Sequence, residues 1–502
     1  MTFHFISRAP KARLHARLHV RGDQRTHQPM NDSVFAFDTI SHPGRREWLV
    51  IAFVAALTLL FLPMVVWKVV GLGQGDVQVF FRAGWAVWTG YPLYEVTDHH
   101  GWTYHYPPTF ALFMGPFANP LPGHPQPSWA LPFTASVVVW YFINAACLLL
   151  ALHVWANTLE RYRSIEARPG FLQGPWLIRL APLLALLPFI GDGLARGQPA
   201  PVLLLLIVLF FALYVENRLA GAAFAFALAI TIKVFPLVLA IFPLLRRDWK
   251  FLAWAAGWGI ILLVGLPTIC LGPVATLDLY RTMFTEHLGG IVSGSMSPKI
   301  ASEVSPGGYS SIGVGSVVAR VAAGAAFYSS PLPGWASALQ LLFNAIVVAA
   351  VAILGRGGFW NLRGAQPAAG YPLLVAGSVL FAAIPLMIAF AGPQYVTCAV
   401  PLIGVLMVET WRRAGEEVVS GAMIGWAFFA WMSMIALEVP WNWVKLIGPM
   451  TWALLLLAPP SLSLIGKVST KSDVAHTAGQ RLGQRTVRPP VSALDGATGP
   501  MP

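Results

Sequence analysis

The sequence has few charged residues and few cysteines, and each shortage argues against a class of protein. Only 11% of its 502 residues are charged, whereas 56% are hydrophobic. Soluble domains carry about 25% charged residues, so this composition predicts a polytopic membrane protein rather than a string of soluble domains. The three cysteines, Cys147, Cys270 and Cys398, lie inside or at the end of apolar runs. This placement favours packing roles over a disulfide framework.

Several catalytic motifs are also missing. The chain has no P-loop, no GxSxG and no HExxH sequence, so nucleotide hydrolysis and zinc proteolysis lack support. The net charge of +12 is spread over short loops and two tails without neighbouring aromatic platforms. This pattern is typical of positive-inside topology and not of nucleic-acid binding. The 40 prolines and 46 glycines predict many broken or short membrane helices.

The charge pattern divides the chain into three parts. We expect a disordered basic cytoplasmic tail at 1–45, an integral membrane domain at 46–465 and a disordered cytoplasmic tail at 466–502. The basic flank of the first apolar run places the N-terminus inside. Counting spans from there places the C-terminus inside as well, and two large segments, about 71–128 and 273–335, outside.

Apolar runs predict an all-α fold with about twelve transmembrane helices. The segment 106–119 is apolar but short, and counting it as a span would place the basic loop 161–179 outside, so we interpret it as a juxtamembrane helix on the outer face. Three consecutive spans are unusually short and are expected to line a cavity in the membrane. The expected spans are 48–70, 129–155, 180–194, 202–215, 219–232, 234–245, 251–271, 336–354, 371–390, 396–410, 422–437 and 446–459.

Asp76 stands at the start of the polar, aromatic stretch 75–108 that follows the first span. One interpretation is an N-cap, because a helical pattern follows and Gly90 stands where that helix would stop. Another is a general base, because a carboxylate fixed at the membrane surface can accept a proton from a hydroxyl group. The two roles are compatible.

Four basic residues on the outer side are further candidates. Lys233 stands where two short spans meet, and an ionisable residue at membrane depth indicates function unless it is a snorkelling anchor. Arg196 reaches the same face, and the pair could bind a phosphate. His287 belongs to the second outer segment, while Arg82 is either a ligand-binding or a snorkelling residue.

The polar stretch also carries tyrosines and histidines. Tyr94 and Tyr106 are expected to be interfacial aromatic residues. His99, His100 and His105 match no known spacing of metal ligands, so the sequence predicts no metal site and no cofactor, and assigns these histidines no role.

Five segments in order resemble a known family. They are Asp76 with FFRAGWAVWTGYPLY, then YHYPPTFALFMGPF, ARGQPAPVLLLL, LAGAAFAFALAITIKVFPLVLAIFPLLRRDW and finally GPQYV. With them the chain resembles the polyprenol-phosphate-dependent mannosyltransferases of glycosyltransferase family 87, which have the C-type glycosyltransferase (GT-C) fold. Where that family commonly has Gln-Asn, this chain has Gln198-Pro199, and where a His-Tyr pair is common it has Gln394-Tyr395.

The resemblance implies an inverting transfer of a hexose, mannose above all, from a polyprenyl-phosphate sugar to a hydroxyl group of a lipid or glycan acceptor. The reaction would take place on the periplasmic or outer face, with Asp76 as general base and Arg196, Lys233 and His287 at the donor phosphate. A transporter or flippase for a lipid-linked sugar is the alternative, although large outer segments and the lack of an evident internal repeat favour an enzyme. The expected substrate-binding residues are Arg82, Tyr94, Tyr106, Gln198, Gln394 and Tyr395.

Overall fold

The computed structural model describes residues 45–163, 174–288, 311–323, 332–354, 370–388, 391–414, 416–437, 445 and 447–460. The tails predicted at both ends fall outside these ranges, apart from Arg45. Within the described residues the regular structure is helical, with a single antiparallel bridge between Thr97 and Thr103. This confirms the prediction of an all-α fold.

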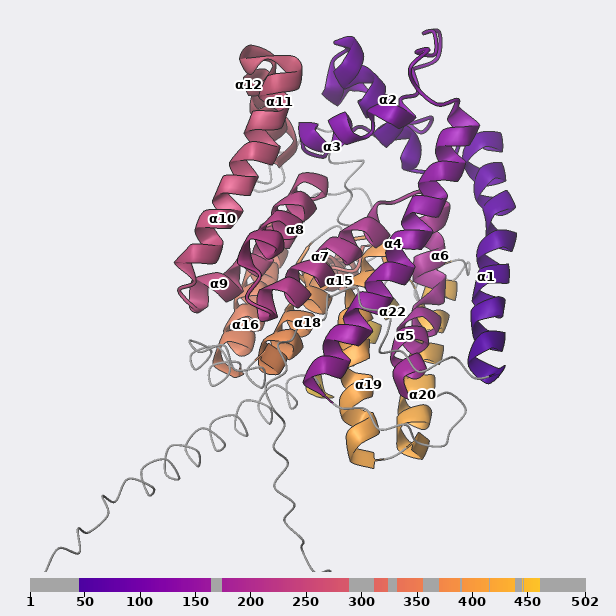
Figure 1. The fold of residues 1–502 in the computed structure, drawn as a ribbon, viewed down its shortest axis with the longest axis vertical. Coiled ribbons are helices and arrows are strands. Elements are labelled where there is room, and N and C mark those ends of the chain that lie inside the picture. The colour runs from indigo at the N-terminus through magenta and orange to yellow at the C-terminus, as the bar shows by residue number, and fades with distance from the viewer. Residues whose placement is uncertain are drawn as a thin grey trace, which may run out of the picture.

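Helices of very different length make up this fold (Figure 1). The longer α-helices are α1 (Arg45–Val66), α2 (Val77–Thr89), α4 (Phe133–Tyr162), α5 (Gly174–Ala185), α7 (Ala200–Val215), α8 (Leu219–Ile232), α10 (Trp249–Gly259), α12 (Pro273–Thr282), α15 (Val314–Ala323), α16 (Gly334–Leu354), α18 (Gly370–Met387), α19 (Val400–Ala414) and α20 (Glu416–Ile435). The shorter ones are α3 (Pro108–Phe113), α6 (Leu187–Ala195), α9 (Ile241–Leu245), α11 (Leu266–Leu271) and α22 (Pro449–Leu455). Further 3₁₀ and π turns are η1 (Trp67–Gly71), η2 (Leu93–Glu95), η3 (Gly115–Phe117), η4 (Phe235–Ala240), η5 (Ile260–Gly265), η6 (Met283–Leu288) and η9 (Pro393–Ala399).

Each of the twelve segments predicted to span contains helix, and the protein is a multi-pass membrane protein. Among the described residues, six helices are long and apolar enough to cross a membrane, or up to seven when one bent pair counts as a span. The helices at 200–215, 219–232 and 235–245 are apolar but shorter, in agreement with the three short segments read from the sequence. The count of twelve spans therefore stays a prediction.

The bent pair replaces the single span expected at 180–194. Helices α5 and α6 meet at an angle of 61°. Pro188 has no N–H to donate to the carbonyl of Leu184, so the helix is interrupted there. The indole N–H of Trp431, on α20, donates instead to the carbonyls of Leu184 and Ala185 at 3.2 and 3.1 Å. The bend is thus held by a helix from the far end of the sequence.

Helices α2 and α3 form a layer over one end of the bundle, together with α11 and α12 (Figure 1). We call this end, which carries Asp76, the Asp76 end. Helices α2 and α3 approach closely because Gly84 has no side chain: a Cβ there would lie 2.6 Å from the carbonyl oxygen of Met114. The segment 106–119 forms only the short helices α3 and η3, which are too short to span a membrane, as predicted.

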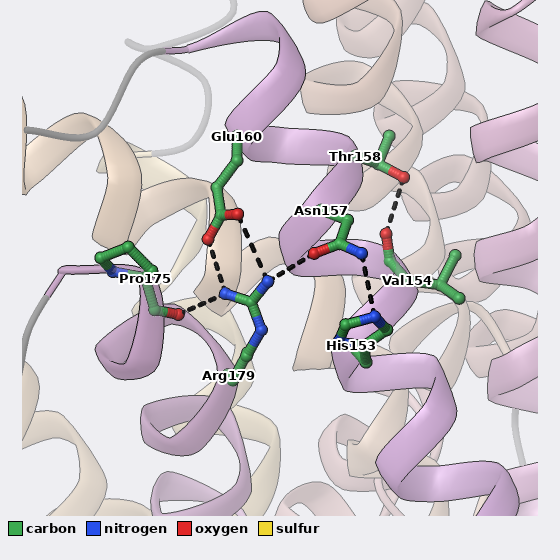
Figure 2. Close-up of polar contacts among 7 residues, drawn as sticks. All are labelled: His153, Val154, Asn157, Thr158, Glu160, Pro175 and Arg179. Carbon is green, nitrogen blue, oxygen red and sulfur yellow. Dashed lines mark hydrogen bonds and ion pairs between the residues drawn. The ribbon is translucent and has the colours of Figure 1, made fainter. Parts of the chain in front are cut away.

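Charged side chains join the helices at the opposite end, which we call the Arg179 end. The guanidinium of Arg179 donates to Glu160 and to the carbonyl of Pro175 at 2.6 Å, and it also contacts Asn157 (Figure 2). Arg163 pairs with Glu409 at 3.6 Å, and Arg161 pairs with Glu216. All these arginines belong to the region predicted to be cytoplasmic, so the structure confirms that they share one end of the bundle. Arg179, expected in a loop, is instead a buried residue of α5.

Candidate active site

Asp76 occupies the N-cap position of α2, but its carboxylate does not cap the helix. The N-cap residue makes no side-chain hydrogen bond to the helix, which ends as expected at Gly90 in the left-handed conformation with φ 76°. The Asp76 carboxylate instead accepts a hydrogen bond from the side-chain amide of Gln198. Asp76 as a whole is half-buried. The prediction that Asp76 stands at the N-cap position is therefore confirmed, whereas the prediction that its side chain caps the helix is wrong.

Gln198 links Asp76 to two further predicted residues. Its amide oxygen accepts a hydrogen bond from Lys233 Nζ at 3.1 Å. The same ammonium group donates to the hydroxyl of Tyr395 at 3.0 Å and lies 4.4 Å from the centre of the Tyr395 ring. Asp76, Gln198, Lys233 and Tyr395 thus form one continuous polar chain, which we call the Asp76 chain. It joins four segments predicted to lie on the outer face.

Further contacts hold the segments of Asp76 and Gln198 together. The N–H of Val77 donates to the carbonyl of Arg196 at 3.0 Å, which ties the start of α2 to the turn after α6. In that turn Gly197 has φ +66°, and an added Cβ would lie 2.5 Å from the Cβ of Val77. The indole of Trp140 donates to the carbonyl of Gly197 at 2.8 Å. Glycine is therefore required at this position both for conformation and for space.

Lys233 is placed by the break between α8 and η4. Its backbone is extended, with φ −145° and ψ 138°, and it follows the last residue of α8. Pro236 stands three residues later, as the second residue of η4, and prevents a continuous helix. The break turns the Lys233 side chain into the protein, where it is 5% exposed. A buried ammonium group must be compensated, and the Asp76 chain supplies its partners.

The electrostatic environment of Asp76 contains opposing contributions. Burial raises the pKa of this carboxyl group above its ordinary value, because it disfavours the charged form. The charge of Arg196, the hydrogen bond from Gln198 and the charge of Lys233 all act to lower the pKa. The balance is a carboxylate that is more basic than a solvated one and is still surrounded by positive charge. These properties suit a general base.

Arg196 lies beside this chain, and its charge acts on Asp76. Its Nε donates to both carboxylate oxygens of Asp192 at 3.0 and 3.1 Å, four residues earlier on α6. The Arg196 side chain is 37% exposed, whereas that of Asp192 is 13% exposed. Asp192 is missing from the sequence predictions, although the i, i+4 spacing of an acidic and a basic residue is a recognisable signal.

Tyrosines form one wall of the site. The Lys233 ammonium lies 5.3 Å from the centre of the Tyr106 ring, and burial raises the pKa of Tyr106 to about 12. Tyr94 donates from its hydroxyl to the carbonyl of Tyr106 at 3.3 Å and is buried. Tyr106 is thus brought to the Asp76 chain, while Tyr94 supports it from behind.

Arg82 and the histidines lie at the edge of this region. Arg82 is 3% exposed and donates to the carbonyl of Thr97, so the snorkelling interpretation is wrong. Its other terminal nitrogen lies 3.4 Å from His99 Nε2. The His99 ring covers Gly73, where an added Cβ would lie 2.7 Å from it. Arg82 therefore holds the 97–103 turn, and no hydrogen bond joins it to the Asp76 chain among the described residues.

Two predicted residues remain. Gln394 lines a small pocket together with Lys233 and Tyr395, beside the apolar side chains of Leu203 and Phe381. His287 is the second-last residue of η6, and its side chain lies outside the described part of the chain. Among the described residues, no three His, Cys, Asp or Glu side chains converge in a way that could hold a metal ion.

Comparisons with known proteins give matches to a family model, to a curated relative and to solved structures. The model of the family described as glycosyltransferase family 87 matches residues 104–385, which is more than half of the chain. Gln198 and Lys233 lie inside this range, and Asp76 precedes it. A curated relative, the polyprenol-phosphate-mannose-dependent alpha-(1-2)-phosphatidylinositol mannoside mannosyltransferase of Mycolicibacterium smegmatis, is 28% identical over 220 residues. These residues cover 41% of this chain and 46% of that protein, so the chain matches less than half the length of this relative.

A solved structure is also similar. The crystal structure of ArnT from Cupriavidus metallidurans bound to undecaprenyl phosphate matches with a TM-score of 0.42 and 12% identity. The match covers 90% of this chain and 84% of that chain.

Proposed function

The chain belongs to glycosyltransferase family 87, and we propose that it transfers a hexose, mannose above all, from a polyprenyl monophosphate to the hydroxyl group of an acceptor. The observation that carries this proposal is the carboxylate of Asp76, held by Gln198 in a buried chain with Lys233 and Tyr395. Such a group is fixed in place and has a raised pKa, and Asp76 is not fully buried. The donor class is that named for the M. smegmatis relative. A GT-C fold is part of the proposal.

The reaction balances with Asp76 as the base. The acceptor oxygen forms a bond to C1 of the sugar from the face opposite the phosphate, and its proton passes to the Asp76 carboxylate. The bond between C1 and the phosphate oxygen breaks, and polyprenyl phosphate leaves with both electrons of that bond. The configuration at C1 is inverted. Asp76 returns to its charged form when it releases the proton to water.

The cations of the site favour this step because negative charge accumulates on the departing phosphate. We propose that Arg196 contacts that phosphate, because its side chain is partly exposed and its backbone carbonyl accepts a hydrogen bond from the N–H of Val77, next to Asp76. Lys233 acts mainly through the Asp76 chain: it orients Gln198 and supplies positive charge. His287 keeps its predicted role at the phosphate. Fixed charges of this kind stabilise a transition state more than a ground state.

The remaining predicted residues divide into two groups. Tyr106, Gln394 and Tyr395 border the Asp76 chain, so we propose that they contact the sugar or the acceptor. Arg82 and Tyr94 donate hydrogen bonds to backbone carbonyls of the 97–106 segment. We propose that they position this segment and act on the substrates indirectly. We further propose that the Asp76 end faces the periplasm or cell exterior and that both termini are cytoplasmic, since the arginine-rich end is opposite.

A single-component assay tests the proposed function. Purified protein in lipid nanodiscs receives a polyprenyl-phosphate mannose and candidate lipid or glycan acceptors, and mannose transfer is measured with the anomeric configuration of the product. Transfer by the protein alone supports an enzyme. Movement of an intact donor across sealed vesicles, without any product, would instead support the transporter alternative.

A further inference from the structure

An apolar groove opens beside the site described above. Helix α1 stands at the edge of the bundle next to α6 (Figure 1), and its side chains are mostly exposed. Between α1, α4, α5, α6 and Trp431 of α20 lies a groove of about 480 Å³, lined mainly by leucine and other apolar side chains. This volume lies within the range of ligand sites, about 300–1,000 Å³.

Polar contacts keep this groove open at its sides. The hydroxyl of Tyr141, on α4, donates to the carbonyl of Thr58 on α1 at 2.7 Å, which fixes the two walls relative to one another. Trp431 binds the carbonyls at the bend between α5 and α6, as described above, and so fixes the third wall. The bend moves α6 off the axis of α5. The groove is therefore a consequence of the 61° bend and of three long-range hydrogen bonds.

Charged residues also line the groove. Lys68, in η1, lines it together with Asp192 of α6. The charge of Asp192 is compensated by Arg196, with both oxygens accepting from the same nitrogen. Among the described residues, no carboxylate pairs with the Lys68 ammonium group. The groove therefore carries a net positive charge at the position of Lys68, which complements an anionic headgroup attached to an apolar chain.

The groove adjoins the candidate active site through the end of α6. Ala195 lines it, and the carbonyls of Ala195 and Arg196 lie against Gly75, where an added Cβ would be 3.7 and 3.3 Å away. Asp76 is the next residue. Lys68 lies near this point, because its carbonyl accepts a hydrogen bond from the N–H of Gln74, two residues before Asp76, at 3.0 Å. A headgroup held by Lys68 would thus lie next to the segment that carries the base.

We propose that this groove binds the isoprenoid chain of the polyprenyl-phosphate donor, with Lys68 as a phosphate-binding residue. The inference rests on the proposed function for the identity of the donor. A single apolar chain that ends in a phosphate matches one apolar groove with one uncompensated cation.

Gly191 allows the groove to be filled with little disturbance of the fold. It lines the groove, and an added Cβ would lie 3.6 Å from the ring of Phe61, an ordinary contact distance. Gly191→Leu therefore places a larger side chain in the groove. Gly257→Leu is the matched control: it introduces the same side chain on α10, where an added Cβ meets no atom within 4 Å.

The experiment compares a long-chain donor with a soluble analogue of two isoprene units, using full-length protein in nanodiscs. Gly191→Leu should lower kcat/KM for the long-chain donor by about tenfold or more, since a misfit of one methylene in an apolar pocket has effects of that order. For the short analogue, Gly191→Leu should keep the wild-type kcat/KM. Gly257→Leu should keep the wild-type kcat/KM for both donors. Lys68→Met should lower kcat/KM for both donors, and Lys68→Arg should keep part of the wild-type kcat/KM.

A binding measurement separates this proposal from the proposed function. Native mass spectrometry of protein incubated with a polyprenyl phosphate should show the lipid retained by wild type and lost by Gly191→Leu. Loss of retention without any transferase activity in wild type would support the groove and refute the proposed function. Normal transfer with undiminished retention by Gly191→Leu, or an effect on the KM of the acceptor alone, would refute the groove.

Discussion

Replacement of Asp76 by Asn tests the central assignment, and the structure predicts its size. The asparagine oxygen can still accept the hydrogen bond from Gln198, so its amide nitrogen would face the position of the acceptor. The variant loses the base without losing the contact that holds it. General base catalysis contributes about 10²–10⁴-fold, so kcat/KM should fall by that factor. At 1.36 kcal/mol per factor of ten, this is about 3–5 kcal/mol in the activation free energy.

The effect of Asp76→Asn on stability should be much smaller. A hydrogen bond to a charged acceptor contributes about 1 kcal/mol more than one to a neutral acceptor, and only that difference is lost. The assay measures initial rates of sugar transfer in nanodiscs, alongside the melting temperature of the same preparation. Asp278→Asn is the control, because it removes an exposed carboxylate from α12 at the same end of the bundle.

A clear result would refute the assignment of Asp76. If Asp76→Asn kept more than about a tenth of the wild-type kcat/KM, which is less loss than a general base requires, another group would have to accept the proton. If the melting temperature fell together with the activity, the loss would reflect unfolding, and the small predicted change in stability would be wrong.

Three further predictions concern the Asp76 chain and the opposite end of the bundle. Lys233→Met should move the acidic limb of the pH profile of kcat/KM to higher pH, because loss of this cation raises the pKa of Asp76, whose active form is deprotonated; an unchanged limb would contradict this. Gly197→Ala should lower kcat/KM by about 10²-fold, since a Cβ 2.5 Å from that of Val77 must displace the turn; unchanged kinetics would show that the turn can adjust. Arg179→Met should destabilise the protein by about 3 kcal/mol, measured by thermal unfolding, because its carboxylate partner stays partly buried without its counter-charge; neutralising that partner as well should recover part of the loss, and a purely additive effect would argue against the pairing.

Local patterns in the sequence determined the helices and the general organisation. Hydropathy and proline placement predicted the helical segments and the non-spanning segment at 106–119, because both signals are read within about twenty residues. The charge pattern grouped Arg161, Arg163 and Arg179 at one end and Lys233 at the other, and the observed contacts agree. These assignments need no knowledge of which helices pack together.

Only the tertiary structure decided what the polar side chains contact. The bond between Gln198 and Asp76 joins residues 122 positions apart, and no local pattern shows that the carboxylate turns from the helix cap to this amide. The same holds for the burial of Arg82 and for the groove that contains Lys68. Hydropathy is a property of each segment, whereas the partner of a buried charge depends on which segments pack against one another. For this reason the sequence identified Asp76 and Lys233, and the fold showed how one amide connects them.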